Sequence, residues 1–249
     1  MRNLAIIQAR MNSSRLPGKV MTKFSGVSVI CHVVNRVKLA RTVSKVYVAT
    51  TVHPSDQQLI KHCVDHNFNI FVGSENDVLD RYYQLAKLEM PDNIVRITAD
   101  CPVIDPSVID MVVENHLNSG ADYTSNTMIN PYPDGQDVEV FKFASLERAW
   151  RAAELKSDRE HVTPYIKFGK ENFSTNFIEG PAELSKLRMT LDEPEDFEML
   201  SCLFEKLYEK DNYFSLSEII ECVKNYPHIT SINGHFLREE GYRKSLERD

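Results

Sequence analysis

The stretch N-L-A-I-I-Q-A-R-M-N-S-S-R-L-P-G-K, residues 3–19, decides how this chain folds at its amino end. Residues 3–8 form an apolar run with the length of a buried strand, and a loop follows them. The next segment, residues 28–40, has apolar side chains at helical spacing. A strand, a loop and a helix in this order predict the first unit of a parallel sheet.

The same alternation continues to about residue 120. Apolar runs at 45–50, 68–73 and 93–99 predict three more strands. Helical patterns separate or follow them: one opens at Pro54 and runs to about His66, one spans 76–88 with Asn76 as its cap, and one begins at Pro106 and ends at Leu117. We therefore expect an α/β fold, with a mostly parallel, Rossmann-like central sheet and helices on both faces. Ligands of such sheets bind beyond the carboxyl ends of the strands.

The second half is less regular and contains more β structure. Strands are expected at 121–125, 137–143 and 185–192, and helices at 145–155, 159–168 and from the acidic turn 192–198 to Tyr208. The tail, residues 216–249, is expected to be helical. No linker or repeat interrupts the chain, so we expect a single domain over residues 1–249.

Composition limits the class of protein. The chain has 249 residues, of which 42% are hydrophobic and 26% charged, as in ordinary globular proteins. No apolar run approaches the roughly 18 residues of a membrane span, and the amino end does not read as a secretory signal. We expect a cytoplasmic protein with no membrane partner. The five cysteines lack a C-x-x-C pair, and the spacing of the histidines shows no zinc pattern, which disfavours disulfides and zinc sites.

Charge is distributed unevenly along the chain. The net charge of −7 argues against general nucleic-acid binding. Residues 1–50, however, contain nine Lys or Arg and no acid; the first acid is Asp56. An acidic protein with such an amino end is expected to hold an anion there. The alternative is that these cations lie on solvated helix faces.

The loop after the first strand carries the cations that could bind phosphate. Arg10, Arg15 and Lys19 lie within ten residues, between a strand and a helix, where backbone amides and cations can surround a polyphosphate. The loop is not a Walker motif, because Ser13 stands where a Gly is needed and Val20 follows the Gly-Lys pair. It is not a dinucleotide motif either, so a kinase or dehydrogenase is disfavoured. A plain basic surface loop is the alternative.

Residues 6–19, I-I-Q-A-R-M-N-S-S-R-L-P-G-K, resemble the opening of the cytidylyltransferases related to the spore coat polysaccharide biosynthesis protein. These enzymes are similar to the acylneuraminate and deoxy-octulosonate cytidylyltransferases, which activate acidic sugars as CMP conjugates. Five further blocks look like family blocks in the family's order: FVGSENDVLDRY (71–82), VRITADCPVIDP (95–106), DGQDVEVF (134–141), REHVTPYI (159–166) and MTLDEPEDFE (189–198). Together with the opening block, they are distributed along residues 3–200.

The resemblance implies a nucleotidyltransferase of the Rossmann-like, GT-A-like type that transfers CMP from CTP to a small-molecule acceptor. The acceptor would be an acidic or modified sugar for surface polysaccharide, and pyrophosphate would be released. Residues 1–120 would bind the nucleotide, and residues 121–215 would bind the acceptor and supply a second metal ligand. By similarity, Gln8 and Ala9 would face the base and ribose, and Arg81 would lie near the nucleotide. Arg10, Arg15 and Lys19 would hold the triphosphate. A homodimer is possible, as for many soluble enzymes.

A divalent cation should bridge the phosphates, with Mg²⁺ expected and Mn²⁺ as the other choice. Asp100 resembles the family's metal-binding aspartate, and Asp192 resembles a second acidic ligand; each comes directly after an expected strand. With Arg15 and Lys19, Asp100 is expected to be catalytic. The alternatives are that Asp100 caps a turn before Pro102 and that Asp192 belongs to an acidic helix start.

Three further residues could contact the acceptor. Asp137 and Glu139 alternate with valines and would share one face of a strand. His161 could orient or deprotonate an acceptor hydroxyl, or could simply make structural hydrogen bonds. For Arg81, a surface pair with Asp77 is the alternative. Arg96, inside a strand, is expected to form a buried ion pair.

Three other functions stay open. An enzyme of the same fold could use another nucleoside triphosphate, or could be a nucleotide-sugar glycosyltransferase, although the chain has no Asp-x-Asp motif. A non-catalytic nucleotide-binding subunit would be expected to lack the metal carboxylates or the phosphate-binding cations. The chain has both sets, which favours catalysis.

Overall fold

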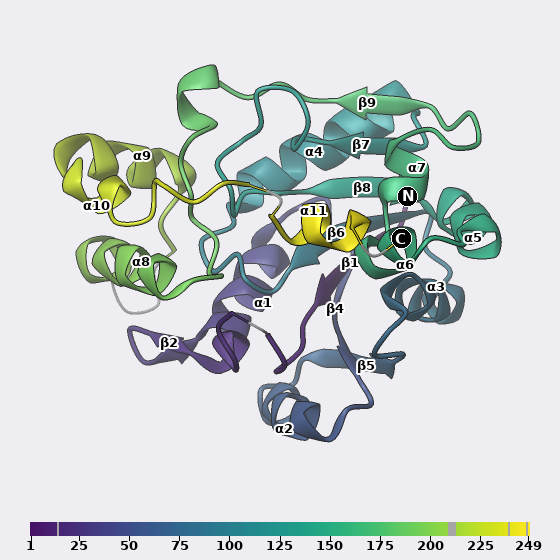
Figure 1. The fold of residues 1–249 in the computed structure, drawn as a ribbon, viewed down its shortest axis with the longest axis horizontal. Helices are drawn as coiled ribbons and strands as arrows, with labels where there is room; N and C mark the ends of the chain where they lie inside the picture. The colour runs from purple at the N-terminus through teal and green to yellow at the C-terminus, as the bar shows by residue number, and fades with distance from the viewer. Residues whose placement is uncertain (14, 209–212, 239, 248) are drawn as a thin grey trace.

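The structure, a computed structural model, describes residues 1–13, 15–208, 213–238, 240–247 and 249. Its centre is a seven-stranded sheet in the order β5-β4-β1-β6-β8-β7-β9 (Figure 1). The strands are β1 (Asn3–Gln8), β4 (Lys45–Thr51), β5 (Asn69–Gly73), β6 (Asn93–Thr98), β7 (Tyr123–Ser125), β8 (Glu139–Lys142) and β9 (Thr175–Phe177). Within this sheet, β8 alone runs antiparallel to its neighbours. The mostly parallel sheet expected from the sequence is confirmed.

Helices cover both faces of the sheet, as expected. On one face lie α1 (Val29–Leu39), α2 (Gln57–Asp65), α4 (Pro106–Ser119), α8 (Pro194–Leu207), α9 (Leu216–Asn225) and α10 (His228–Ser231). On the other lie α3 (Val78–Glu89), α5 (Phe143–Ala152), α6 (Lys156–His161), α7 (Pro164–Lys167) and, against α6, α11 (Glu240–Leu246). Three 3-10 turns, η1 (Lys19–Met21), η2 (Pro54–Asp56) and η3 (Ala182–Leu184), and a hairpin of β2 (Lys23–Phe24) and β3 (Val27–Ser28) complete the fold.

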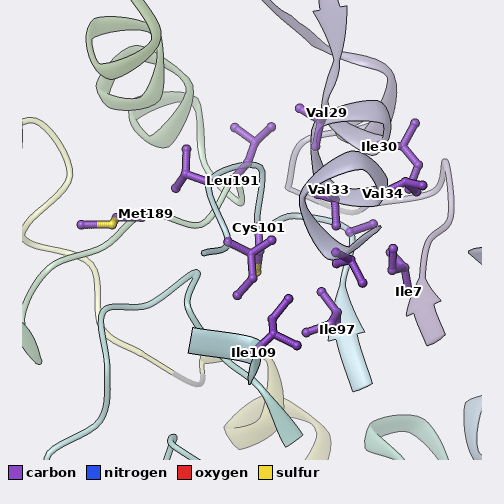
Figure 2. Packing of buried hydrophobic residues seen from close by; sticks show 14 of the residues in the cluster. Ile7, Val29, Ile30, Val33, Val34, Ile97, Cys101, Ile109, Met189 and Leu191 are labelled. Atoms are coloured by element: carbon purple, nitrogen blue, oxygen red, sulfur yellow. The ribbon is translucent and has the colours of Figure 1, made fainter. Parts of the chain in front are cut away.

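The alternation of side chains along β1 explains the two layers. Ala5 and Ile7 are buried under α1, whereas Leu4 and Ile6 are buried under α3 on the opposite face. Figure 2 shows Ile7 and the neighbouring Ile97 of β6 packed below the valines of α1. Because both faces are apolar, the strand reads as a continuous apolar run.

Several predicted boundaries are corrected. Asp77, not Asn76, caps α3, since its side chain accepts a hydrogen bond from the amide of Asp80. The helix expected over 54–66 is a 3-10 turn followed by α2. The helix expected over 159–168 is broken into α6 and α7 by Pro164, because proline cannot donate the helical hydrogen bond.

The strand expected at 185–192 is wrong. This segment makes only an isolated bridge, between Asp134 and Arg188. Its backbone crosses the carboxyl ends of the strands: the Met189 amide donates to the Asp134 carbonyl at 2.6 Å, and the Leu191 amide donates to the Asp100 carbonyl at 2.8 Å. The segment therefore brings the acidic turn after it to the edge of the sheet where ligands bind.

The tail is helical in α9, α10 and α11, while residues 239 and 248 lie outside the described part of the chain. None of the helices in the described residues has both the length and the apolar character needed to span a bilayer.

Candidate active site

A cavity of about 1070 Å³ opens at the carboxyl ends of β1 and β6. These strands are parallel neighbours, with Gln8 beside Thr98, so the segments that leave them begin side by side. The residues singled out in the sequence all line this cavity: Gln8, Ala9, Arg10, Arg15, Lys19, Arg81, Asp100, Asp137, Glu139, His161 and Asp192.

A buried carboxylate holds the loop that carries the cations. The Met11 amide donates to Asp56 at 2.7 Å, and Asp56 also accepts from the amide of Thr51 at the end of β4. At the far end of the loop, Gly18 adopts φ 73°, which favours glycine, and its amide donates to the Met11 carbonyl at 2.9 Å. The loop is thereby closed on itself and attached to the sheet.

Lys19 lies between the two predicted metal ligands. Its ammonium nitrogen is 2.7 Å from Asp100 and 2.6 Å from Asp192. Burial alone would lower the pKa of Lys19, but the two carboxylates raise it above its usual value. Burial opposes ionisation of Asp100 in the same way, yet Lys19 lowers the pKa of this carboxyl to about 2. Asp100 is therefore charged at neutral pH, and the carboxylates of Asp100 and Asp192 both point at the Lys19 ammonium.

Asp100 and Asp192 are not used as helix caps. Asp105 caps α4, since it accepts from the Ser107 amide at 2.7 Å. At the start of α8, the capping box is formed by Glu193 and Asp196. Neither carboxylate is thus the N-cap of α4 or α8, although Asp192 directly precedes the acidic start of α8, and both line the cavity.

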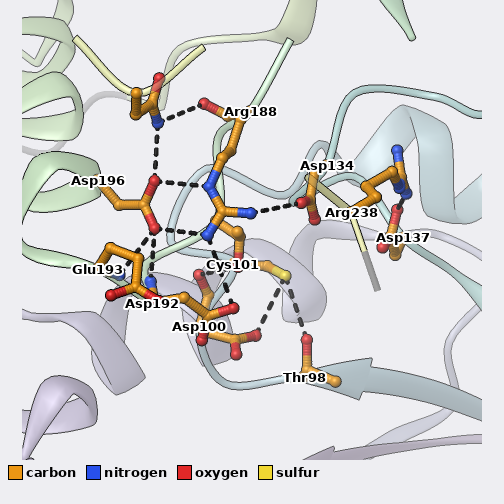
Figure 3. A network of polar contacts seen from close by, with 12 residues as sticks. Thr98, Asp100, Cys101, Asp134, Asp137, Arg188, Asp192, Glu193, Asp196 and Arg238 are labelled. Atoms are coloured by element: carbon orange, nitrogen blue, oxygen red, sulfur yellow. Dashed lines mark hydrogen bonds and ion pairs between the residues drawn. The ribbon is translucent and has the colours of Figure 1, made fainter. Parts of the chain in front are cut away.

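The position of Asp192 depends on a buried arginine that the sequence did not single out. Arg188 donates twice to Asp196, each at 2.8 Å, and once to Asp134 at 3.0 Å, as Figure 3 shows. Asp196 also accepts from the Asp192 amide at 2.9 Å. Asn233 donates to Asp196 at 2.8 Å, so the carboxyl-terminal segment supports this network. The available signal was the four-residue spacing of Arg188, Asp192 and Asp196, in and directly before the block 189–198.

Arg15 contacts the same acidic turn from the other side. Its guanidinium is 2.9 Å from Asp192 and 3.2 Å from Glu193. Two cations from the loop and two carboxylates from distant segments therefore meet at one end of the cavity. Such a site can bind a phosphate chain together with a hard divalent cation.

Arg81 is buried in the wall of the cavity rather than paired on the surface. Among the described residues, its Nε atom has no hydrogen-bond partner, and its Nη1 lies 3.5 Å from the Ala49 carbonyl. Burial lowers the pKa of this guanidinium. Asp77, its alternative partner from the sequence, instead forms an ion pair with Arg159.

The sequence profile of the cytidylyltransferase family matches residues 4–231. The chain belongs to the cytidylyltransferase family. It is 36% identical to an uncharacterized protein of Methanocaldococcus jannaschii, over 99% of this chain and 100% of that protein. It is 34% identical to the spore coat polysaccharide biosynthesis protein SpsF of Bacillus subtilis, over 90% of this chain and 95% of that protein.

A solved structure agrees with this assignment. A cytidylyltransferase from Leptospira borgpetersenii superposes with a TM-score of 0.88 and 31% identity, covering 96% of this chain and 100% of the other. The resemblance seen in the sequence, the nucleotidyltransferase fold and the enzyme class are thus confirmed.

In this cytidylyltransferase, Glu139 is held by three partners. It forms an ion pair with Arg96, as expected for a buried arginine, and accepts from Tyr123 at 2.5 Å and from Thr163 at 2.7 Å. Burial opposes ionisation of Glu139, but Arg96 lowers its pKa to about 2. Asp137 precedes β8 rather than sharing a strand face with Glu139, as the sequence had suggested, and it forms an ion pair with Arg238. Both carboxylates line the cavity.

His161 faces the carboxyl-terminal tail of the cytidylyltransferase. Its Nε2 is 2.9 Å from the Ser245 hydroxyl, and its ring packs edge-on against Tyr242. Burial lowers the pKa of this imidazole, so it is neutral at physiological pH. The sequence did not indicate that the tail would line the cavity, because its pattern is weakly amphipathic and its partners are more than 80 residues away.

Proposed function

We propose that this cytidylyltransferase joins CMP from CTP to an acidic sugar, with release of pyrophosphate, in the synthesis of surface polysaccharide. The observation that carries the proposal is the meeting of Arg15 and Lys19 with Asp100 and Asp192 at the carboxyl ends of the sheet. The two cations can balance the negative charge of a triphosphate, and the two carboxylates can supply oxygen ligands to the divalent cation that accompanies it. The name of SpsF, a full-length relative, supports a polysaccharide pathway.

The reaction makes one bond and breaks one. An acceptor oxygen attacks the α-phosphorus of CTP, the bond from this phosphorus to the bridging oxygen breaks, and pyrophosphate leaves with that oxygen. The attacking hydroxyl gives up its proton. Negative charge grows on the phosphoryl oxygens, so catalysis depends mainly on positioning and on cations. Arg15 can donate to two oxygens at once, whereas Lys19 supplies a compact charge.

Asp100 and Asp192 fit Mg²⁺, because their donors are charged oxygens and both carboxylates meet at one cation, the Lys19 ammonium. When bound, Mg²⁺ would neutralise charge on the phosphates and orient them. Lys19 would then exchange the carboxylates for phosphate oxygens. Gln8, Ala9, Arg10 and Arg81 line the neighbouring wall of the cavity and are proposed to contact the nucleotide.

The other half of the cavity has the chemistry for an anionic, hydroxylated acceptor. The cations that line it include Lys156, Arg159 and Lys167, and His161 and Glu160 lie among them. Cations favour a carboxylate, and the acidic and imidazole groups suit hydroxyls. Because Glu139 has its oxygens occupied and its pKa lowered, we propose that it positions Arg96 and Thr163. His161 is proposed to orient the attacking hydroxyl.

A pyrophosphate-release assay tests the proposal. Four nucleoside triphosphates are crossed with acidic sugars such as 3-deoxy-manno-octulosonate and N-acetylneuraminate, and with neutral sugars. We expect release with CTP and an acidic sugar, and a loss of at least about 100-fold in kcat for Asp100→Asn. Glu221→Gln, which neutralises an exposed acid on α9, serves as the matched control.

Three results would contradict the proposal. Preference for another triphosphate would assign a different nucleotide. CTP binding without turnover of any acceptor would favour a non-catalytic binding subunit. Full activity of Asp100→Asn would remove this carboxylate from the mechanism.

A further inference from the structure

A second group of metal-ligand side chains lies outside the cavity, between α1 and α2. Cys31, His62 and His66 each offer one ligand atom, and these atoms lie within 4.8 Å of one another. None of the three lines the cavity of the candidate active site. The cysteine and histidine patterns in the sequence gave no sign of this group, because it joins residues from two separate helices.

The two histidines are spaced to face one ion. His62 and His66 lie four residues apart, in the last turn of α2 and at its end, so their side chains project from the same face. Their ring centroids are 4.2 Å apart. Cys31, in the first turn of α1, places its sulfur 3.3 Å from Nε2 of His62. In a tetrahedral zinc site, the usual bond lengths place S and N about 3.5 Å apart.

The hydrogen bonds of both imidazoles leave lone pairs for a metal. Nδ1 of His66 donates to the His62 carbonyl at 2.8 Å, because a carbonyl can only accept, so the lone pair is on Nε2. Metal-bound histidines commonly donate their other ring N–H to a carbonyl in this way. Nε2 of His62 is 2.8 Å from the Ser28 hydroxyl and can accept its hydrogen, so the lone pair is on Nε2, and a metal would replace this hydroxyl as its partner.

We propose that Cys31, His62 and His66 bind a transition-metal ion of the zinc class, with water as the fourth ligand. One sulfur and two imidazole nitrogens match zinc and related ions, whereas Mg²⁺ prefers oxygen. The site is therefore chemically distinct from the pair of carboxylates in the cavity. Binding forms a sulfur–metal bond and releases the thiol proton to solvent.

The burial of the ligands gives the ion a path to the site. Cys31 is buried, His62 is half-buried and His66 is exposed, so an ion enters from solvent over His66 and reaches the sulfur last. Once bound, it would join the first turn of α1 to the end of α2. That first turn is linked to the segment that follows the cation-bearing loop. The Val29 amide donates at 2.8 Å to the carbonyl of Thr22, which directly follows η1. The site is thus placed to stabilise the fold within residues 1–120, the half of the chain proposed to bind the nucleotide.

Cobalt is a suitable probe, because a cobalt–thiolate bond produces a near-ultraviolet charge-transfer band that oxygen ligands do not give. The full-length protein is reduced, stripped with a chelator, and titrated with Co²⁺. We expect one equivalent to produce the band and Zn²⁺ to abolish it by displacement. Zinc should also raise the Tm. Cys31→Ser should lose the band, and His66→Ala should weaken cobalt binding by at least about tenfold.

Two control variants isolate the site. Cys202→Ser removes a partly exposed thiol on α8, and His228→Ala removes an exposed imidazole on α10; both should keep the band. Asp100→Asn should keep it too, which separates this proposal from the proposed catalytic function. The absence of a thiolate band at saturating cobalt would overturn the proposal, as would an unchanged cobalt affinity in His66→Ala. His66 is exposed, so this variant reports on binding even if Cys31→Ser fails to fold.

Discussion

At the scale of single residues, the Arg96–Glu139 pair shows how a buried charge in this enzyme is balanced by an opposite charge. Glu139 is buried on β8 and bonds to side chains from β6, β7 and the turn before α7. Removing one partner of a buried pair leaves the other charge unpaired, which is strongly destabilising. The ion pair therefore stabilises the part of the cavity wall that we propose binds the acceptor.

The lowered pKa of Glu139 predicts a pH-dependent contribution to stability. A shift from the usual 4.5 to about 2 corresponds to about 3 kcal/mol. Because the folded pKa is the lower one, this contribution is complete above pH 4.5 and decreases as the pH falls toward 2. Urea unfolding should show a gap between wild type and Glu139→Gln that shrinks to less than half between pH 6 and about pH 3. A gap independent of pH over this range would show that Glu139 does not have the low pKa.

The residues that we propose bind phosphate and metal were singled out from the sequence and lie together in the structure, but the residues that support them were not. Lys19, Asp100 and Asp192 stand in recognisable blocks, at the ends of expected elements. Arg188 and Arg159 also stand in or next to such blocks, but their partners are decided by contacts across the fold. Because Arg159 lies 82 residues from Asp77 in the sequence, no local pattern could indicate that they form an ion pair.

At the scale of elements, the crossing of two loops decides where Asp192 lies. Gly135 adopts φ 100°, and a Cβ there would come within 2.6 Å of the Met189 carbonyl carbon. The close approach allows the backbone of Asp134 to bond to Leu187 and Met189 on the crossing segment. This explains why the strand predicted at 185–192 is wrong: its hydrogen-bond partner is a loop.

Gly135→Ala should therefore disrupt this crossing. The expected loss is about 2–5 kcal/mol of unfolding free energy, from left-handed strain and overpacking together. Gly120→Ala is the matched control, since Gly120 also has a positive φ, 64°, but a methyl carbon added there would meet no atom within 4 Å. It should cost only about 1–2 kcal/mol. Denaturant melts measure both, and equal losses would show that the close approach to Met189 is unimportant.

The elements predicted well are those with long regular patterns. β1, α1, β4, α3, β6 and α4 were located to within a few residues, because each buries an apolar face against the central sheet. β9, three residues at the sheet edge, was missed, as its side chains are exposed or half-buried and show no alternation. The distinction between short strands and extended loops depends on partners that the local sequence does not specify.

At the scale of the whole molecule, the carboxyl-terminal tail completes the wall of the cavity. The family profile ends at residue 231, yet Leu237, Arg238, Tyr242 and Ser245 line the cavity. Ser245 joins α11 to α6 through His161, at 2.9 Å, and Glu160, at 3.0 Å. The Asp249 carboxylate accepts from the Ser157 amide at 2.8 Å, which attaches the end of the chain to the start of α6. The last part of the tail, α11 to Asp249, therefore lies against the side of the cavity that we propose binds the acceptor.

This placement predicts that changes in the tail affect the acceptor and not the nucleotide. Ser245→Ala removes the hydroxyl that holds His161, so the KM for the acceptor should rise about three- to tenfold, the value of one hydrogen bond. The Kd for CTP should stay unchanged, because Lys19 and Asp100 lie at the other end of the cavity. Ser231→Ala, on the exposed face of α10, is the matched control and should change neither constant. Steady-state kinetics and CTP titration measure the two effects separately. Weaker CTP binding in Ser245→Ala, with an unchanged acceptor KM, would mean that the tail supports the nucleotide site instead.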